Sequence, residues 1–443
     1  MKRTHSTRRR RSGRLVFTLL VAGTLVAGMA GCGMGGGSDE GPEGSGPVKE
    51  PTEPVTITFS SWVGNEAGMK RLYAKFRKKH PNITVEFQNV PAEQSQQKLT
   101  TQLAGGNPPD TAYVDAGTVG AFASRNALLN LDNYLERSEL IDPDEYVEAF
   151  KSFVTYENSM YGLPFDGEST GLFYRTDMFE AAGIEHPPTT WEEFEAAAKA
   201  LTKPEKKQYG FQLFAPEAAY YWYPWLWQAG GELLTKDQKA VAFDSPAGKR
   251  AAEFYVGLKE YSTPDYLNSN SYDGRVAFAN GQVGMYVAGA WFAGVLEDEF
   301  PKISGKWASA PLPEGEAGCA TTIAGDALVI FANSDHPDAA WKWIEFLGSP
   351  ENVAEWTYKS EGTLLPPIQS QLDSPELIEE KPVLEGFAEA MACGRSNIIT
   401  NEKWGQVEEA LGEELSRAIY GEKSATEAIE DAAAKGNEIL AED

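Results

Sequence analysis

The first folded part of the chain alternates short apolar strands with amphipathic helices. Residues 55–59 alternate apolar and polar positions as a strand does, whereas residues 69–80 place Met69, Leu72 and Phe76 on one face of a helix. A strand at 83–87, a helix at 94–104 and a strand at 111–115 follow. Strands that alternate with helices in this order form a parallel sheet with helices on both faces. The pattern therefore predicts an α/β fold.

The same kinds of segment recur in the second half, and no internal sequence repeat relates them to the first. Thr190 and Glu193 predict a capping box at the start of one helix. Strands are predicted at 171–174, 283–287 and 327–330, and helices at 338–347 and from 406 onward. The α/β pattern thus extends over most of the chain.

The N-terminus has a basic head followed by an apolar run over residues 15–31. That run is shorter than the ~20 residues of a membrane span, and it predicts a secretory signal peptide. Its end, Met29-Ala30-Gly31-Cys32, resembles a bacterial lipobox, in which Cys32 is lipidated and becomes the mature N-terminus. The alternatives are an ordinary signal peptide with an incidental cysteine, or an uncleaved anchor. Residues 33–54 are rich in Gly, Pro and Glu and lack aromatic residues, so we expect a flexible linker there.

Composition limits the partners of the protein. The 443 residues predict two or three domains, and 42% apolar residues suffice for a core. A formal net charge of −26 disfavours nucleic acid and anionic lipid surfaces, and leaves neutral or cationic ligands. Solubility alone is another reason for an acidic surface.

The cysteines and histidines are few. If Cys32 is lipidated, Cys319 and Cys393 are left as an even pair, which indicates a disulfide in an oxidising compartment; two separate buried thiols are the alternative. His80, His186 and His336 each precede a proline, and none has metal-ligand spacing. We therefore expect no metal and no cofactor.

The sequence bears on two classes of hydrolase. Residues 167–171 match the G-x-S-x-G nucleophile elbow, but the motif leads into a predicted strand rather than a helix, which disfavours a serine hydrolase. A glycosidase needs two facing carboxylates, and with 65 Asp and Glu residues the sequence neither selects such a pair nor excludes one.

Aromatic residues are the more prominent candidates for ligand contact. Trp62, Trp291 and Trp404 lie near the ends of predicted elements, and further rings crowd residues 220–227. Aromatic faces pack against the apolar faces of sugars, while Asp, Glu and Asn side chains bind the hydroxyl groups. Packing in the core is the alternative, which we favour for Trp341, Trp343 and Trp356 because of their helical spacing.

Several motifs are distributed along the chain: Leu103–Asp110, Gly162–Pro164, Gly171–Phe179, Pro188–Phe194, Trp227–Gly231, Phe278–Gly281 and Ala339–Leu347. In combination they resemble the extracellular solute-binding proteins of bacterial ABC importers, in the sugar-binding group that includes maltose-binding protein. The resemblance covers essentially the whole chain after Val55, and the lipobox agrees with it.

This resemblance implies a two-lobed periplasmic-binding-protein fold of the α/β class, with the ligand cleft at a hinge that the chain crosses several times. Crossings are expected near Leu163-Pro164, near Ala310 to Pro313 and near Pro366 to Leu372. The N-terminal lobe would comprise 55–163 and 311–368, and the C-terminal lobe 164–310 and 369–443. Residues 1–31 would be the signal peptide, and 32–54 the lipidated cysteine and linker.

The resemblance also implies a ligand site, which agrees with the rule that open α/β sheets bind ligands at the ends of their strands. The expected contacts are Ser60, Trp62, Gly64, Asp115, Asp166, Glu168, Tyr221, Trp222, Trp291, Gly325, Asp326 and Trp404. The aromatic segment 220–227 aligns least surely. Few basic residues fall near these positions, so a neutral sugar fits better than a phosphorylated one.

The predicted function is therefore capture of a neutral carbohydrate outside the cell by a monomeric, membrane-anchored lipoprotein that delivers it to the permease subunits of an ABC transporter. No catalysis, cofactor or nucleic acid is expected. The alternatives are a polyol, glycerophosphodiester or peptide as ligand of the same fold, a secreted glycosidase, and a cell-surface scaffold.

Overall fold

A computed structural model of the chain describes residues 46–215, 218–263, 274–359, 362–396, 398–399, 401 and 403–442. The predicted signal peptide, Cys32 and residues 33–45 lie outside the described residues. Across the described ranges, no helix combines the length and the apolar character that a membrane span needs.

The first elements form the predicted βαβαβ unit. It consists of β1 (Val55–Ser61), α1 (Ala67–Lys79), β2 (Ile83–Asn89), α2 (Ala92–Ala104) and β3 (Thr111–Asp115). β1 pairs in parallel with both β2 and β3, as predicted. The apolar face of α1 is buried through Met69, Leu72 and Phe76, which is why this helix packs on the sheet.

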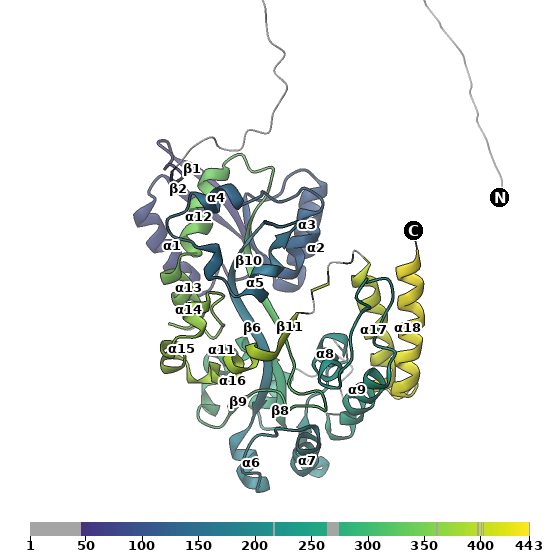
Figure 1. The fold of residues 1–443 in the computed structure, drawn as a ribbon. Coiled ribbons are helices and arrows are strands. Elements are labelled where there is room, and N and C mark those ends of the chain that lie inside the picture. The colour runs from purple at the N-terminus through teal and green to yellow at the C-terminus, as the bar shows by residue number, and fades with distance from the viewer. Residues whose placement is uncertain are drawn as a thin grey trace, which may run out of the picture. The chain divides into compact units, whose positions relative to one another are not determined.

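The sheet is mixed beyond these strands, so the expectation of a parallel sheet is wrong for its second part. Its order is β2-β1-β3-β10-β6-β8-β7, with β6 (Leu163–Tyr174), β7 (Tyr209–Phe211), β8 (Val283–Gly289) and β10 (Thr321–Ile330). β10 runs antiparallel to β3 and β6, because the chain returns to the first half from the far end of the molecule. β6 pairs with β10 from Leu163 to Ser169 and with β8 from Thr170 to Tyr174, so it passes through both halves (Figure 1).

Short strands complete the pairing. β9 (Ala308–Ala310) pairs with β6, β11 (Gly394–Ser396) pairs with β10, and β4 (Thr155–Tyr156) forms a separate hairpin with β5 (Ser159–Met160). The remaining helices are α3 (Val119–Ala123), α4 (Asp132–Glu136), α5 (Glu148–Phe153), α6 (Thr176–Ala182), α7 (Trp191–Leu201), α8 (Ala218–Gln228), α9 (Pro246–Gly257), α10 (Gly274–Ala279), α11 (Trp291–Glu299), α12 (Pro337–Leu347), α13 (Pro350–Thr357), α14 (Gln369–Leu372), α15 (Pro375–Glu380), α16 (Glu385–Ala390), α17 (Trp404–Ile419) and α18 (Ala425–Ala441).

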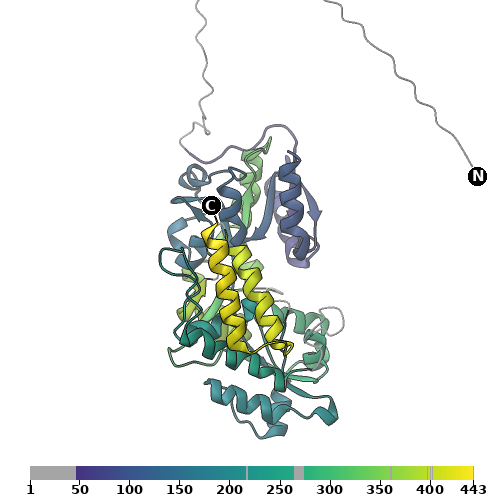
Figure 2. The ribbon, with the colours of Figure 1, turned by 90° about the vertical axis from the view of Figure 1, so that its right-hand side faces the viewer.

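Separate hydrophobic clusters stabilise the two halves. One joins β1, β2 and β3 to α1 and α12, and includes Trp341, Trp343 and Trp356, which are core residues as predicted. A second joins α7, α8 and α9 to the C-terminal helices α17 and α18, which lie side by side in Figure 2. A third lies around β8, α11 and α16. The fold is thus the two-lobed α/β fold, whereas the exact lobe bounds stay a prediction.

The predicted flexible linker is wrong for residues 46–54. Val48 is only 4% exposed and joins the first hydrophobic cluster. His80 Nδ1 lies 2.6 Å from Glu50 Oε1, and Asn82 Nδ2 donates to the carbonyl oxygen of Pro51 at 2.8 Å. One buried valine and these polar contacts bind the segment to the first lobe, although its composition alone favours disorder.

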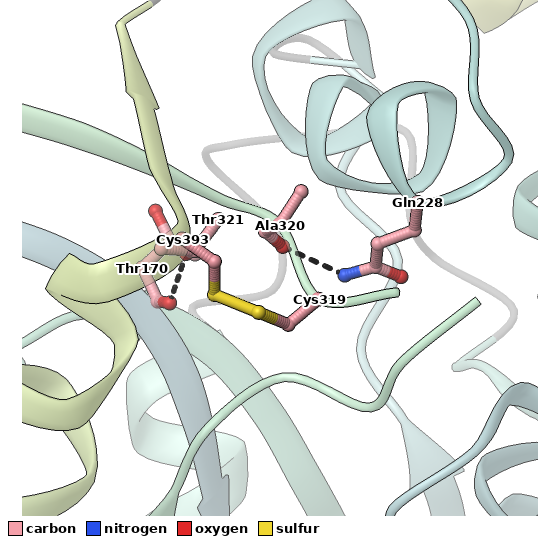
Figure 3. Close-up of a disulfide and its surroundings, with 6 residues drawn as sticks. All are labelled: Thr170, Gln228, Cys319, Ala320, Thr321 and Cys393. Atoms are coloured by element: carbon pink, nitrogen blue, oxygen red, sulfur yellow. Dashed lines mark hydrogen bonds between the residues drawn. A yellow bond between two sulfur atoms is a disulfide. The ribbon is translucent and has the colours of Figure 1, made fainter. Parts of the chain in front are cut away.

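A disulfide joins Cys319 and Cys393, whose Cα atoms are 5.9 Å apart (Figure 3). It links the chain just before β10 to the chain just before β11. Beside it, Thr321 Oγ1 donates to the carbonyl oxygen of Thr170, and Gln228 Nε2 donates to that of Ala320 at 2.8 Å. The bridge therefore ties together strands that meet at the junction of the two halves.

A carboxylate-rich candidate ligand site

Three aspartates lie in register on neighbouring strands. Asp326 of β10 stands opposite Asp115 at the end of β3 and opposite Asp166 of β6. The ladder between β10 and β6 is irregular directly after Asp326. Gly325 permits the close approach there, because a Cβ atom on it would lie 2.5 Å from the carbonyl oxygen of Asp166. The strands thus bring the three predicted aspartates together.

Tyr113 lies between two of these carboxyl groups. Its hydroxyl oxygen is 2.8 Å from Asp166 Oδ2 and 2.6 Å from Asp326 Oδ2. Trp356 Nε1 also donates to Asp166 Oδ2, at 2.7 Å. A phenol has one proton to donate, so one of the two carboxyl groups must hold a proton for both contacts to be hydrogen bonds.

Burial raises the pKa of both aspartates, which favours one proton held by the pair. Burial raises the pKa of Asp166 to about 6, against the lowering effect of its hydrogen bonds from Trp356 and Tyr113. Burial and the charge of Asp166 raise the pKa of Asp326 well above its usual range. The protonated carboxyl group of the pair donates to Tyr113, which in turn donates to the ionised one.

Two glutamates belong to the same electrostatic cluster. Burial, followed by the charges of Asp166 and Asp115, raises the pKa of Glu168 to about 8. Burial, Asp166 and Asp298 raise the pKa of Glu66 to about 7. Glu66 precedes α1 and was not predicted; its only signal in the sequence is its position just after the predicted Trp62 loop.

Asp115 and Glu66 lie at the surface, and desolvation is the largest cause of the raised pKa of each carboxyl group. Neighbouring protein therefore displaces part of the solvent around both groups.

An open groove of about 660 Å³ lies along α17. Its lining residues are Ala219, Tyr220, Gly405, Glu408, Glu409, Gly412, Glu413, Ser416 and Arg417. Burial and the charge of Asp115 raise the pKa of Glu408, and the Tyr223 hydroxyl donates to Glu408 Oε1 at 2.5 Å.

Two of the predicted tryptophans stand beside the carboxylates. The ring of Trp62 is 4.6 Å from that of Tyr113. Trp291 is 37% exposed, an unusual environment for a large apolar side chain. A Cβ atom on Gly289 would lie 2.2 Å from Glu168 Oε2 and 2.7 Å from Trp291 Cδ1, so these two side chains converge over that glycine. Trp291 thus presents an open aromatic face next to a carboxyl group.

The aromatic segment requires a correction. Residues 218–228 form α8, and Trp222 faces the core with 0% exposure, so it is not a ligand contact. Tyr221 is half-buried and lines a different, small cavity, whereas Tyr220 lines the α17 groove. The cause is the helical period, which turns adjacent residues to different faces.

Trp404 is also mainly a core residue. Only 5% of it is exposed, and its ring packs 6.4 Å from that of Tyr223, the tyrosine bound to Glu408. The expectation of an open stacking face is therefore wrong for Trp404, which instead supports the groove from behind.

Ser60 and Gly64 have different environments. Ser60 is buried at the carboxyl end of β1, and its Oγ atom has no hydrogen-bond partner among the described residues. Gly64 is packed so tightly that a Cβ atom there would lie 2.3 Å from Asn89 Oδ1. The Ser60 hydroxyl therefore stays a proposed ligand contact, whereas Gly64 shapes the loop.

The described residues give little support to a serine hydrolase or to a metal site. The G-x-S-x-G sequence lies inside β6, and Ser169 is buried and donates to the carbonyl oxygen of Phe387. Within the described part of the chain, no three His, Cys, Asp or Glu side chains are grouped so that they could hold a metal ion.

Comparison with known proteins gives the family. The sequence model of the bacterial extracellular solute-binding protein family matches residues 60–354. The chain belongs to this family. Its members and structural neighbours are substrate-binding transport proteins. The family is extracellular, as its name states.

Individual relatives bind sugars and polyols. The chain is 29% identical to a solute-binding protein of Thermotoga lettingae whose structure holds α-D-tagatose, with a TM-score of 0.79 over 88% of this chain and all of that one. It is 26% identical to a lactose-binding protein of Rhizobium radiobacter, over 64% of this chain and 67% of the relative. It is 27% identical to a mannitol-binding protein of Pseudomonas aeruginosa, again over 64% and 67%.

Proposed function

We propose that the protein is the substrate-binding lipoprotein of an ABC importer, which captures a neutral carbohydrate outside the cell and delivers it to the membrane permease. Family membership over residues 60–354 is the observation that carries this proposal. The mechanism is closure of the two lobes around the ligand, without chemical change of the ligand.

The candidate site suits a polyhydroxyl ligand. Asp115 and Glu168 offer carboxyl oxygens to ligand hydroxyl groups, and the Ser60 hydroxyl lacks a partner among the described residues. The open face of Trp291 packs against an apolar sugar face. Asp166, which is fully engaged by Tyr113 and Trp356, positions its neighbours rather than the ligand.

Membrane attachment is part of the proposal. Residues 1–31 would be removed as a signal peptide, and Cys32 would carry the lipid. Because residues 46–54 pack on the first lobe, the tether would be limited to residues 33–45. In a bacterial host, the wild-type chain should be found in the membrane fraction, and Cys32→Ala should shift it to soluble or uncleaved forms. An unchanged membrane association of the processed variant would contradict the anchor.

The ligand class can be tested directly. Residues 33–443 are titrated with monosaccharides, oligosaccharides and polyols while tryptophan fluorescence and the melting temperature are recorded. A saturable signal, together with a melting temperature that rises with ligand concentration, is expected for one class. Silence across the panel in a folded protein would contradict carbohydrate binding.

A polyol is the second candidate ligand. The similarity to a mannitol-binding protein favours it, and mannitol in the panel distinguishes it from sugars. A glycosidase is tested with the same oligosaccharides, because turnover would release shorter products and binding alone would not.

A further inference from the structure

We propose that the solvent-facing side of α1 docks on the anionic lipid surface of the membrane to which the protein is tethered. The inference rests on the membrane attachment that is part of the proposed function. It goes beyond that attachment, because it names the surface of the folded protein that meets the lipid. Three observations carry it: the charge of this helix, the place where the tether joins the fold, and the position of the ligand site.

The solvent-facing side of α1 carries only basic and small residues. The opposite side packs in the first hydrophobic cluster through Met69, Leu72 and Phe76. The basic residues turned away from the core, which we call the basic face of α1, are Lys70, Arg71, Lys75, Arg77, Lys78 and Lys79. The helix has no acidic residue, although the chain has 65 Asp and Glu against 39 Lys and Arg. The basic face is therefore an exception to the charge of the molecule.

Helix stability explains only part of this charge. Lysines in the last turn compensate the helix macrodipole, but Lys70 lies in the first turn, where the macrodipole disfavours a positive charge. Glu355 of α13 binds Arg71 and Lys75. Among the described residues, no carboxylate lies within ion-pair distance of the other three lysines, Lys70, Lys78 and Lys79, which are all exposed. Three cations of the basic face thus lack a protein partner there.

The tether joins the fold beside the C-terminal end of α1. Val48 is buried in the first cluster, and Glu50 Oε1 lies 2.6 Å from Nδ1 of His80, the residue directly after α1. The carbonyl oxygen of Gly46, the first described residue, accepts from Arg137 Nε at 2.9 Å. Residues 33–45 cover at most about 45 Å even when fully extended. A lipid on Cys32 therefore keeps this end of α1 close to the membrane.

The ligand site lies at the other end of the strands. β1 and β2 are parallel, so the intervening α1 runs back and ends at the amino end of β2, where Ile83 N donates to the carbonyl oxygen of His80 at 3.1 Å. Ser60 and Trp62, in contrast, lie at the carboxyl end of β1. Lipid contact at the C-terminal part of α1 consequently leaves the ligand site uncovered, with α1 along the outer edge of the first half (Figure 1).

The acidic charge of the whole molecule does not prevent this contact. A formal net charge of −26 repels anionic lipid, but at physiological ionic strength charges farther than about 8 Å are largely screened. The lipid surface therefore responds mainly to the nearest side chains, and each Lys or Arg near it strengthens binding about fivefold. Because acidic surfaces are repelled from the same lipid, charge selects the orientation in which the basic face meets the membrane.

The first experiment needs no lipid on the protein. Residues 33–443 are floated with vesicles of phosphatidylcholine alone, or of an equal mixture with phosphatidylglycerol, at low and at raised salt. We expect recovery with the anionic vesicles at low salt, loss of this recovery as salt rises, and no recovery with phosphatidylcholine alone. Lys70→Gln/Lys78→Gln/Lys79→Gln should lower the partition onto anionic vesicles at least about tenfold.

A matched variant separates the basic face from total charge. Lys236→Gln/Lys302→Gln/Lys306→Gln removes three exposed lysines of the second half, and it should leave the partition unchanged. The melting temperatures of both triple variants should equal that of the wild type, because the replaced lysines have no ion-pair partner among the described residues.

The second experiment measures orientation. Residues 32–443, with the disulfide intact, are coupled through Cys32 to a maleimide lipid, so that both kinds of vesicle hold the protein equally. Acetylation of lysines is then followed by mass spectrometry. Lys78 and Lys79 should be protected on anionic vesicles relative to phosphatidylcholine, whereas Lys302 and Lys306 should react equally on both.

The outcomes separate this inference from the proposed function. Equal partition of the wild type and the α1 triple variant onto anionic vesicles, or equal acetylation of Lys78 and Lys79 on both vesicles, would overturn the docking and leave carbohydrate capture and the lipid anchor intact. Dependence on the three α1 lysines with protein-containing host membranes alone would assign the basic face to an acidic protein, and would also overturn the lipid proposal. Failure of the anchor itself would appear as soluble wild-type chain in the fractionation experiment.

Discussion

At the scale of single residues, side chains of the candidate site differ in whether other protein groups already engage them. Tyr113 and Trp356 engage Asp166, whereas Trp291 remains open to solvent beside Glu168. Trp291, at the start of α11, is 37% exposed and therefore only partly packed, and we propose that it contributes to ligand binding. This contrast predicts different effects for substitutions of Trp356 and of Trp291.

Replacement of Trp291 by alanine should weaken carbohydrate binding by about 1–3 kcal/mol, the range of aromatic anchors at interfaces, with little change in stability. Titration of the recognised ligand, with urea unfolding in parallel, measures both quantities. Leu140→Ala, at a similarly exposed position, is the matched control. Unchanged affinity in Trp291→Ala would remove this residue from the site.

At the scale of elements, α17 has two faces with different roles. One face lines the groove, and the other buries Glu414 against α18. Burial alone would raise the pKa of Glu414, but hydrogen bonds from Lys423 and Lys435 lower it to about 2. This ion cluster therefore holds the C-terminal helix pair together.

Replacement of Glu414 by glutamine should destabilise the protein by about 1–3 kcal/mol at pH 7, because three partly exposed cations lose their partner. A carboxyl group with a lowered pKa stabilises the fold above its unfolded pKa of 4.5, and this stabilisation is lost as the pH falls toward 2. Urea unfolding measures the free energy of unfolding of both proteins. The difference between Glu414→Gln and the wild type should thus be smaller at pH 3 than at pH 7. Glu438→Gln, on the exposed face of α18, should show no such difference from the wild type. If the loss of stability in Glu414→Gln is the same at both pH values, the ionic explanation is refuted.

The sequence predicted the local elements of this fold better than it predicted the site. Periodicity identified β1, α1, β2, α2 and β3, because their apolar positions follow periods of two or 3.6 residues. It could not identify the antiparallel return of β10, since a buried strand has the same pattern in either direction. Within α8, the many aromatic residues concealed which face was buried, so Trp222 was assigned to the site together with Tyr221, although Trp222 lies in the core and Tyr220 lines the α17 groove. Val48 was missed because a single apolar residue in a polar tract carries no period.

At the scale of the whole molecule, the disulfide acts on the junction of the halves. Cys319 and Cys393 are separated by 74 residues, so the bond restricts a long loop of the unfolded chain. The double variant Cys319→Ser/Cys393→Ser should lose about 2–5 kcal/mol in urea unfolding. Reduction of the disulfide should lower the unfolding free energy of the wild type to that of the double variant. If the unreduced wild type and the variant are equally stable, the prediction is wrong.

The charge state of the ligand-free molecule connects the site to stability. Glu168 and Glu66 have folded pKa values of about 8 and 7, above the ordinary value of 4.5. At pH values between 4.5 and about 8, the folded protein binds more protons than the unfolded chain does. The free energy of unfolding therefore falls as the pH rises through this range. Their contribution is fully present below pH 4.5 and is lost as the pH passes through 7 and 8. We therefore expect the melting temperature of the free protein to decrease from pH 5.5 to pH 8.5.

The double variant Glu168→Gln/Glu66→Gln should flatten this decrease, because neither amide titrates, and it should be the more stable protein at pH 8.5. Glu86→Gln provides a control for the loss of an ordinary exposed carboxylate. A double variant whose melting temperature follows the wild-type pH profile would show that these two glutamates do not hold the protons.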